Sequence, residues 1–495
     1  MIQILYNDLL SLIHSYLPFI DKLNHRNACK QFQSVLGITD LYNIDRKYSN
    51  ALKKINLCKY VDIIQFKLID NRNIIDLNHM TKLKKLNISG CYGKVGDNGI
   101  IALNLEELNA SYNPKITTLN HMTKLKKLEI CSECGVMDNG IIALNLEELY
   151  AENNPKITTL NHMTKLKILD ISYDCRVGDN GIIALNLEEL NASSNPQITT
   201  LNHMTKLKKL DISCDCGVGD NEINALNLEE LNANNNPKIT TLNHMTTLKI
   251  LNIDHSSGVG DNGIIALNLE VLSASCNPNI TTLNHMTKLK KLDINGFYCG
   301  VGDNGIIALN LEKLNAFNNP KITTLNHMTK LKILDIQGNC GVGDNGIIAL
   351  NLEELNASHN SKITTLNHMA KLKILDIQGN CGVGDNGIIA LNLEELNARY
   401  NPKITTLNHM TKLKKLDIGF KCGVGDNGII ALNLEELNAN YNPKITTLNH
   451  MMKLKKLDIQ GNCGVGNNGI NALNLEELYA FYNPKITKNP NYVFK

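Results

Sequence analysis

One hydrophobic skeleton, Leu-x-x-Leu-x-(Leu/Ile/Ala), recurs along most of the chain at intervals of 20 to 22 residues, in two alternating forms. The first form, here called the A coil, runs from Leu331 to Ile336 and continues into a glycine-rich segment that contains Cys340. The second form, the B coil, runs from Leu311 to Ala316 and continues into Asn-Pro-Lys-Ile-Thr-Thr-Leu. Because apolar and polar residues alternate around the second leucine, each coil is predicted to contain one short strand with a buried face.

A longer period joins these coils in pairs. The string Leu-Asn-His-Met occurs ten times at intervals of 41 or 42 residues, beginning at Leu77, Leu119, Leu160, Leu201, Leu242, Leu283, Leu325, Leu366, Leu407 and Leu448. Ten copies at a fixed spacing predict a stacked solenoid instead of several globular domains. Each A coil is also expected to carry a short helix opposite the strand, with Asp344 as the N-cap of such a helix over Asn345–Leu350.

These lengths and spacings resemble leucine-rich repeats. The A coils are similar to the cysteine-containing repeats of many F-box proteins, and the B coils are similar to bacterial and regulatory-subunit repeats. The resemblance implies an α/β solenoid, a leucine-rich-repeat horseshoe with a concave parallel sheet and short convex helices or 3-10 turns. The array is expected at residues 63–486, as about 21 coils, and a C-terminal tail follows at 487–495.

The first sixty residues depart from the repeat. Pro18 ends an apolar run there whose members follow helical spacing: Leu9, Leu10, Ile13 and Leu17. The order of small motifs from Leu5 to Phe32 resembles an F-box, the helical module that docks the adaptor of cullin–RING ubiquitin ligases. The helical spacing alone also fits a cap that shields the apolar end of the first coil.

The F-box resemblance implies a module at residues 1–40 and a linker or N-terminal cap at 41–62. It also implies that the four residues of the helical run contact a Skp1-like adaptor and, through it, a cullin complex. On this interpretation the repeats hold the protein that becomes ubiquitinated, and the ligase chemistry belongs to the partners.

The copies of the repeat differ mainly just after each strand. The seventh and eighth positions of the B coils vary most and include several aromatic residues, whereas the string Leu-Asn-His-Met-Thr-Lys-Leu hardly changes. Tolerance of change at exposed positions would also produce variation, but the equally exposed convex positions did not drift. Exposed aromatic residues are typical anchors of protein interfaces. We therefore expect a concave partner-binding surface that includes Phe317, Arg399, Tyr400, Tyr441, Phe481 and Tyr482.

Charge and hydropathy exclude some classes of protein. Lys and Arg number 50 against 48 Asp and Glu, so the net charge is +2 and the chain is not a polycation that would coat nucleic acid. The sequence has no uninterrupted apolar run of about 18 residues, which predicts no membrane span. Six Gly-x-Gly-x-x-Gly matches recur at the array period without room for a βαβ unit. We expect these glycines to let the chain turn toward the convex face, not to bind a cofactor.

Histidines and cysteines form columns along the array, one per double unit for most of its length. Equivalent positions two coils apart are roughly 9–10 Å apart, which is too far for one metal ion to join or for a disulfide to bridge. The histidines are therefore expected to pack or cap on the convex side, and the cysteines to be reduced thiols in a cytosolic-type compartment. No metal, cofactor or catalytic site is predicted.

The sequence as a whole predicts a substrate receptor of a cullin–RING (SCF-type) ubiquitin ligase that binds an unknown protein target, with neither nucleic acid nor membrane as a partner. The alternative is a non-catalytic leucine-rich-repeat scaffold whose N-terminal helices only cap the solenoid. Near-identical repeats and a composition rich in Asn, Ile and Lys resemble the repeat proteins of giant DNA viruses. That resemblance implies a cytoplasmic location, in the host cell.

Overall fold

The computed structural model describes residues 40–41, 65–67, 75–90 and 94–487. The chain divides into two compact units, residues 1–239 and 240–495. Almost all of the expected F-box-like module and linker lies outside the described residues, as do its four adaptor-binding residues Leu9, Leu10, Ile13 and Leu17. Those expectations therefore stay predictions.

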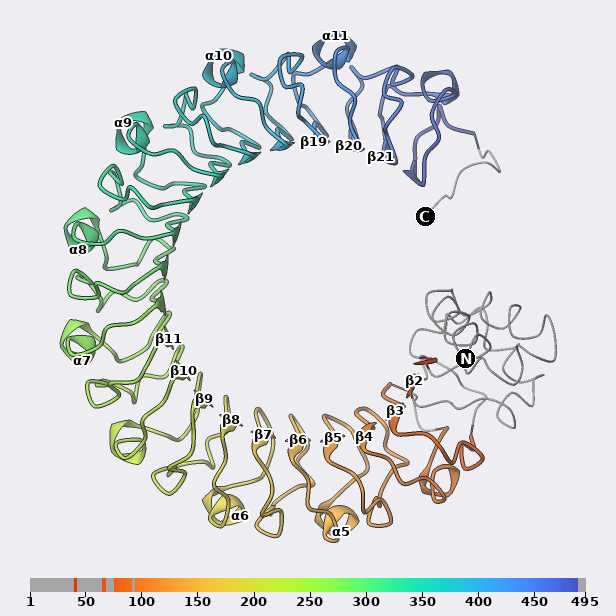
Figure 1. Cartoon of the computed structure of the whole chain (residues 1–495), viewed down its shortest axis with the longest axis vertical. Helices are drawn as coiled ribbons and strands as arrows, with labels where there is room; N and C mark the ends of the chain where they lie inside the picture. The colour runs from red at the N-terminus through yellow and green to blue at the C-terminus, as the bar shows by residue number, and fades with distance from the viewer. Residues whose placement is uncertain (1–39, 42–64, 68–74, 91–93, 488–495) are drawn as a thin grey trace, which may run out of the picture. The chain divides into compact units, whose positions relative to one another are not determined.

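The first unit is a solenoid segment with one short strand per coil. Its parallel strands pair in chain order: β1 (Asp40–Leu41), β2 (Gln65–Lys67), β3 (Lys85–Asn87), β4 (Glu107–Asn109), β5 (Lys127–Glu129), β6 (Glu148–Tyr150), β7 (Ile168–Asp170), β8 (Glu189–Asn191), β9 (Lys209–Asp211) and β10 (Glu230–Asn232). Figure 1 shows its short helices on the side away from the strands: η3 (Asp97–Gly99), α5 (Asp138–Ile141), α6 (Asp179–Ile182) and η4 (Asp220–Glu222).

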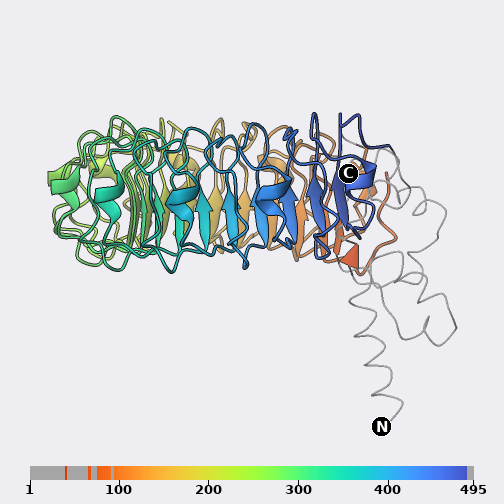
Figure 2. The same cartoon turned by 90° about the horizontal axis from the view of Figure 1, so that it is seen from above.

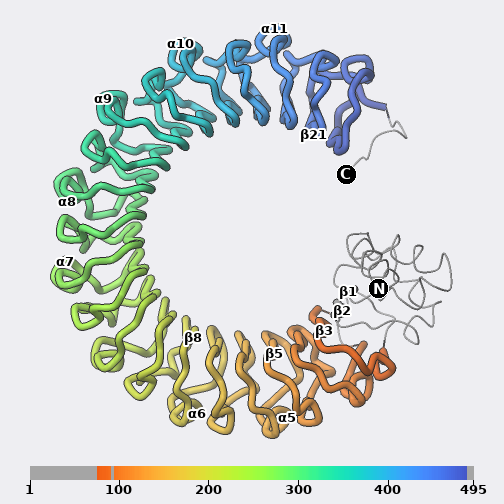
Figure 3. Tube along the Cα trace, in the orientation of Figure 1, coloured from red at the N-terminus to blue at the C-terminus, as the bar shows by residue number. Residues whose placement is uncertain are grey.

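The second unit repeats this arrangement, with its strands side by side on the inner, concave side of its curve (Figures 2 and 3). The strands are β11 (Ile250–Asn252), β12 (Val271–Ser273), β13 (Lys291–Asp293), β14 (Lys313–Asn315), β15 (Ile333–Asp335), β16 (Glu354–Asn356), β17 (Ile374–Asp376), β18 (Glu395–Asn397), β19 (Lys415–Asp417), β20 (Glu436–Asn438), β21 (Lys456–Asp458) and β22 (Glu477–Tyr479). The convex helices are α7 (Asp261–Ile264), α8 (Asp303–Ile306), α9 (Asp344–Ile347), α10 (Asp385–Ile388), α11 (Asp426–Ile429) and η5 (Asn467–Gly469). Both units are thus parallel-sheet solenoids with few, short helices, as the repeat predicted.

The hydrophobic skeleton sets the register of the strands. The leucine at the centre of each strand pairs with the leucine of the next strand, as Leu334 does with Leu355, and both are 1% exposed. A slip of one residue would turn these leucines to the solvent, so the buried face fixes the pairing. The described core is built from Leu, Ile, Val, Ala, Met and Cys, without aromatic residues.

A buried asparagine closes the turn after each B-coil strand. Asn319 Nδ2 donates to the carbonyl oxygens of Ile294 (2.9 Å) and Val301 (3.2 Å), both in the preceding coil, and Asn319 Oδ1 accepts from the backbone N–H of Lys321 (3.0 Å). Leaving a buried carbonyl unpaired costs about 1–3 kcal/mol. The asparagine therefore links successive coils beyond the ends of the strands.

The expected capping role of the aspartates was wrong. Helix α9 begins at Asp344 itself, its N-cap is Gly343, and no side chain caps it. The Asp344 carboxylate instead accepts hydrogen bonds from the backbone N–H groups of Thr364 (2.7 Å) and Thr365 (3.2 Å), and from the Thr364 hydroxyl. The aspartate thus fastens its coil to the next one.

The glycines of the Gly-x-Gly-x-x-Gly motif also act differently from the expectation. Gly341 and Gly346 are not among the residues with positive φ, so no special turn requires them. A Cβ at Gly341 would lie 2.4 Å from the Ile322 carbonyl oxygen, and one at Gly346 would lie 2.2 Å from that of Thr323. Glycine is needed there because the backbone of the preceding coil passes too close for a side chain.

The histidine column confirms the expected convex capping. His327 Nε2 lies 3.1 Å from the carbonyl oxygen of Ile306, the last residue of helix α8, and His409 makes the same contact with Ile388 at the end of α10. The Ile306 oxygen also accepts from the backbone N–H of Leu309 (3.0 Å), so the ring adds a second contact to the carbonyl at the end of the helix. Within the described ranges no cluster of three or more His, Cys, Asp or Glu could hold a metal ion, and no helix is long and apolar enough to cross a membrane.

Candidate functional site

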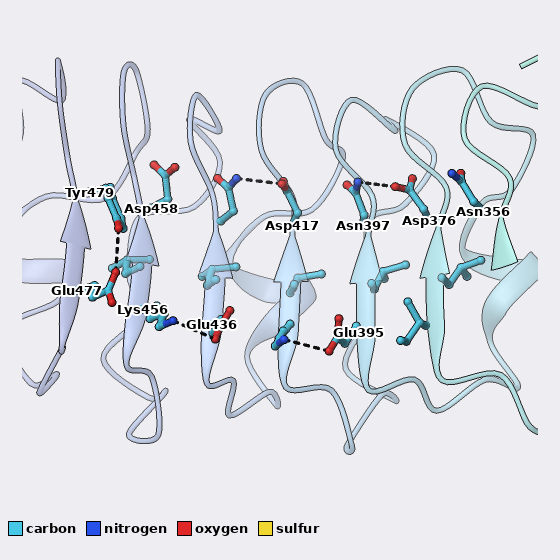
Figure 4. Close-up of a pocket in the computed structure, with 18 of the residues that line it drawn as sticks. Asn356, Asp376, Glu395, Asn397, Asp417, Glu436, Lys456, Asp458, Glu477 and Tyr479 are labelled. Atoms are coloured by element: carbon cyan, nitrogen blue, oxygen red, sulfur yellow. Dashed lines mark hydrogen bonds and ion pairs between the residues drawn. The ribbon is translucent and has the colours of Figure 1, made fainter. Parts of the chain in front are cut away.

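The concave face of the second unit carries a groove of about 770 Å³ over strands β16–β22. Its floor is the sheet, in which the central leucine of each strand points into the core while the first and third residues point out. Figure 4 shows that the outward residues form two rows across the strands. The groove is therefore lined mainly by polar and charged side chains above a floor of leucines.

The first row begins each strand and alternates mainly between Glu and Lys. Lys415 Nζ lies 3.2 Å from a carboxylate oxygen of Glu395, and Lys456 Nζ lies 3.7 Å from one of Glu436. Such exposed pairs contribute about 0–1 kcal/mol each, so they neutralise charge more than they stabilise the fold. The same cross-strand pairing occurs in the first unit, where Lys127 Nζ lies 3.3 Å from a carboxylate oxygen of Glu148.

The second row ends each strand and alternates between Asn and Asp, except in β22, which ends in Tyr479. Asn438 Nδ2 donates to Asp417 Oδ2 (2.9 Å), and the backbone N–H of Gly419 donates to Asp417 Oδ1 (2.8 Å). Burial raises the pKa of Asp417 and of Asp458 above the usual value, and the nearby positive charge of Arg399 opposes that rise. Neutral amide donors therefore satisfy these carboxylates without cancelling their charge.

Three aromatic rings stack beside the groove, just beyond the ends of strands β18, β19 and β20. The ring centroids of Tyr400 and Phe420 are 4.4 Å apart with planes at 23°, and those of Phe420 and Tyr441 are 4.8 Å apart with planes at 18°. We call these three residues the aromatic stack. They occupy the eighth position of three successive coils, so the stacking direction follows the solenoid.

The backbone of the aromatic stack is in the left-handed region, with φ of 58° at Tyr400, 58° at Phe420 and 52° at Tyr441. Five other A coils place glycine at this position, as at Gly338 and Gly461, whereas four place a side chain there in the same conformation: Ser132, Tyr173, Cys214 and His255. A side chain in the left-handed conformation costs roughly 1–2 kcal/mol. Phe420 thus bears a backbone strain that glycine would avoid, and it supplies the ring that joins the two tyrosines.

Arg399 connects the aromatic stack to the groove. Its guanidinium carbon lies 4.1 Å from the Phe420 ring centroid and 5.4 Å from that of Tyr400. Its charge acts on both Asp417 and Asp458, while its Nε atom is buried without a hydrogen-bond partner among the described residues. This guanidinium therefore rests on an aromatic face with carboxylates nearby.

The structure brings together only some of the residues that were predicted to bind a partner. Arg399, Tyr400 and Tyr441 meet through Phe420, which the prediction did not include. A Cβ at Gly461 would lie 2.2 Å from the Tyr441 ring, so the stack ends against that glycine.

The other predicted residues lie apart from the aromatic stack. Phe481 and Tyr482 follow strand β22 at the end of the groove and are 56% and 89% exposed. Phe317 follows β14, outside the groove, and its ring lies near Gly338. The aspartate row was also absent from the prediction, although its regular Asp/Asn alternation was visible in the sequence.

The cysteine column has the expected thiol form. The described members, such as Cys340 and Cys381, are free and buried. Burial raises the pKa of Cys340 to about 11. A thiol with such a pKa stays protonated near neutral pH. These cysteines therefore pack in the hydrophobic core and do not form a reactive centre.

Comparison with known proteins supports the repeat assignment. The leucine-rich-repeat family model matches seven segments of the chain, at residues 79–103, 162–185, 244–267, 327–350, 368–391, 409–432 and 450–473. A comparison with curated proteins finds no match.

One solved structure shares the fold at low sequence identity, and a second gives a weaker match. The crystal structure of the TLR13–ssRNA13 complex is 18% identical, with a TM-score of 0.57, and the match covers 90% of this chain and 76% of that one. The mouse RP105/MD-1 complex is 14% identical, with a TM-score of 0.47 and coverage of 86% and 82%. At such identities the likeness concerns the fold alone.

Proposed function

We propose that this chain, a leucine-rich-repeat protein, is a binding scaffold that holds a partner protein on the concave face over β16–β22. The observation that carries the proposal is the aromatic stack beside the groove. Tyr400 and Tyr441 are each 42% exposed although the described core contains no aromatic residue. Their rings therefore do not serve the fold, and they are placed where a partner would bury them.

The stack is also rigid, which favours binding. Each ring is held by its neighbour, and Arg399 covers the middle ring at 4.1 Å. A partner that packs on ordered side chains loses less conformational entropy than one that must order them. Large aromatic anchors and arginine are the residues that most often dominate the free energy of protein association.

The kind of partner follows from the charge of the groove. The TLR13 structure that shares this fold contains single-stranded RNA. Here, however, acidic side chains outnumber basic ones among the residues that line the groove. Such a face repels phosphates, whereas proteins that bind nucleic acid neutralise them with Lys and Arg. A protein partner is therefore the better fit.

Crosslinking of partner proteins to the full chain, with matched variants, tests this proposal. Phe420→Ala removes the centre of the aromatic stack, whereas Lys412→Ala changes an exposed side chain away from the concave face. We expect the first variant to lose the crosslinked partner and the second to retain it. Equal loss in both, or loss only with Lys412→Ala, would place the binding surface elsewhere.

We propose further that the chain is a substrate receptor of a cullin–RING (SCF-type) ubiquitin ligase. The support is the F-box-like order of motifs at the N-terminus, followed by cysteine-containing coils of the F-box type. On this proposal Leu9, Leu10, Ile13 and Leu17 contact a Skp1-like adaptor, the groove presents the target in the cytoplasm, and the chain itself catalyses no reaction.

A purified adaptor distinguishes this proposal from a cap. We expect the full chain to bind a Skp1-like adaptor, and Leu10→Asp with Ile13→Asp to abolish that binding while the circular dichroism of the array is unchanged. If the wild-type chain does not bind the adaptor, the N-terminal helices only cap the solenoid and the scaffold function remains.

A further inference from the structure

We infer that the groove over β16–β22 recognises a cationic segment of its partner, rich in arginine or lysine. The inference rests on the proposed scaffold function and specifies the chemistry of the partner. It follows from the charge of the groove, from the aromatic stack beside that charge, and from the way in which Arg399 already occupies its edge.

The first and third residues of strands β16–β22 carry a strong excess of negative charge. Seven of them are acidic and two are basic, so the acidic residues exceed the basic ones by five. The acidic residues are Glu354, Asp376, Glu395, Asp417, Glu436, Asp458 and Glu477, and the basic ones are Lys415 and Lys456. Both lysines already pair with glutamates of neighbouring strands.

The same positions on the preceding strands of this unit are balanced. Over β11–β15 the first and third residues include two lysines, Lys291 and Lys313, and two aspartates, Asp293 and Asp335. The repeat itself therefore does not require an acidic face. Within the second unit the excess is confined to the strands that also form the groove and carry the aromatic stack, whereas strands β4–β10 of the first unit carry the same numbers, seven acidic and two basic residues, without that stack.

The chain's own Arg399 shows how a cationic side chain would bind. Its guanidinium lies on the Phe420 ring and close to Asp417 and Asp458, so it combines a cation–π contact with favourable charge. One arginine leaves most of the negative charge of the groove uncompensated. Further basic side chains from a partner would meet carboxylates along the whole aspartate row, at the two-strand repeat shown in Figure 4.

Fluorescence anisotropy with the full chain and defined probes tests the inference. The probes are a labelled peptide of alternating arginine and glycine, a matched peptide of glutamate and glycine, and a short polyuridine RNA. We expect the arginine peptide alone to bind, with an affinity that falls as salt is added because exposed charges are screened beyond about 8–10 Å. Binding of the RNA, or equal binding of both peptides, would overturn the inference.

A matched pair of variants locates the binding. Asp376→Asn, Asp417→Asn and Asp458→Asn combined remove three charges of the groove and keep side chains of the same shape. The control combines Asp293→Asn and Asp335→Asn, whose carboxylates accept the same asparagine hydrogen bond from the next strand, at 2.8 and 3.2 Å. We expect the groove variant to bind the arginine peptide about tenfold more weakly and the control less than about twofold.

Two outcomes separate failure of this inference from failure of the proposed function. If the control weakens peptide binding as much as the groove variant does, the arginine peptide responds to overall charge and the inference is wrong. If no arginine peptide binds but Phe420→Ala still abolishes crosslinking to a protein partner, the scaffold function holds and only the cationic chemistry is refuted. Circular dichroism and the unfolding midpoint of each variant confirm that the fold is intact.

Discussion

Replacing Phe420 by glycine and by alanine separates the cost of the aromatic stack from its contribution. Phe420 has φ of 58°, where glycine is unstrained and alanine is not. Both variants lose two ring contacts, worth about 0.5–1.5 kcal/mol each, and the contact with Arg399, worth about 0.5–1 kcal/mol. Only Phe420→Gly also relieves the left-handed strain, which is roughly 1–2 kcal/mol.

The expected order of stability is therefore the reverse of the usual one. At most positions a protein with glycine is less stable than the same protein with alanine. Here the free energy of unfolding of Phe420→Gly should exceed that of Phe420→Ala by about 1 kcal/mol or more. Urea unfolding of the full chain, followed by circular dichroism, measures the difference between the two midpoints. Both variants should lose partner binding, because both remove the ring. If the alanine variant is the more stable, the left-handed backbone and the account of the stack are wrong.

Three other predictions concern binding, pH and thiol chemistry. Tyr441→Ala or Phe481→Ala should weaken partner binding roughly thirtyfold, which is the effect of losing an anchor worth about 2 kcal/mol. Lys412→Ala should change the affinity little. Titration calorimetry with the purified partner that crosslinking identifies measures both affinities. Acidification should weaken binding of the arginine peptide at a higher pH than an ordinary aspartate would give, because the raised pKa of Asp417 means that its charge is lost earlier as pH falls. Loss of binding only well below the ordinary aspartate range would contradict this. Cys340, with its pKa raised to about 11, should resist alkylation in the folded chain and react after unfolding, and mass mapping that finds it in a disulfide would contradict the coil geometry.

The sequence was sufficient to predict the coil and its core, because both depend on local alternation. The Leu-x-x-Leu skeleton fixes which face is buried, and identical coils then stack in register, as Leu334 and Leu355 do. The position of the convex helices was predicted for the same reason. The first residue of these helices was not predicted correctly. Asp344 binds Thr364 and Thr365, about twenty residues away, and local capping rules do not take such distant partners into account.

The candidate site was predicted only in part, for a similar reason. The residues predicted to bind a partner all came from B coils, whereas the aromatic stack alternates between B and A coils through Phe420. The eighth positions of the two coil types share one left-handed conformation, and that equivalence appears only in three dimensions. The role of Gly341 and Gly346 was likewise hidden, because it depends on the close approach of the preceding coil and not on their own turn.

Site-specific photocrosslinking tests the central claim, that the groove over β16–β22 and its aromatic stack hold the partner protein. Benzoylphenylalanine would replace Tyr441 in one sample and the convex Lys412 in another, in the otherwise unchanged full chain. The account predicts that the first position crosslinks to a protein, through a peptide rich in arginine or lysine, and that the second does not. Crosslinks from the convex position alone, or from both positions equally, would contradict it.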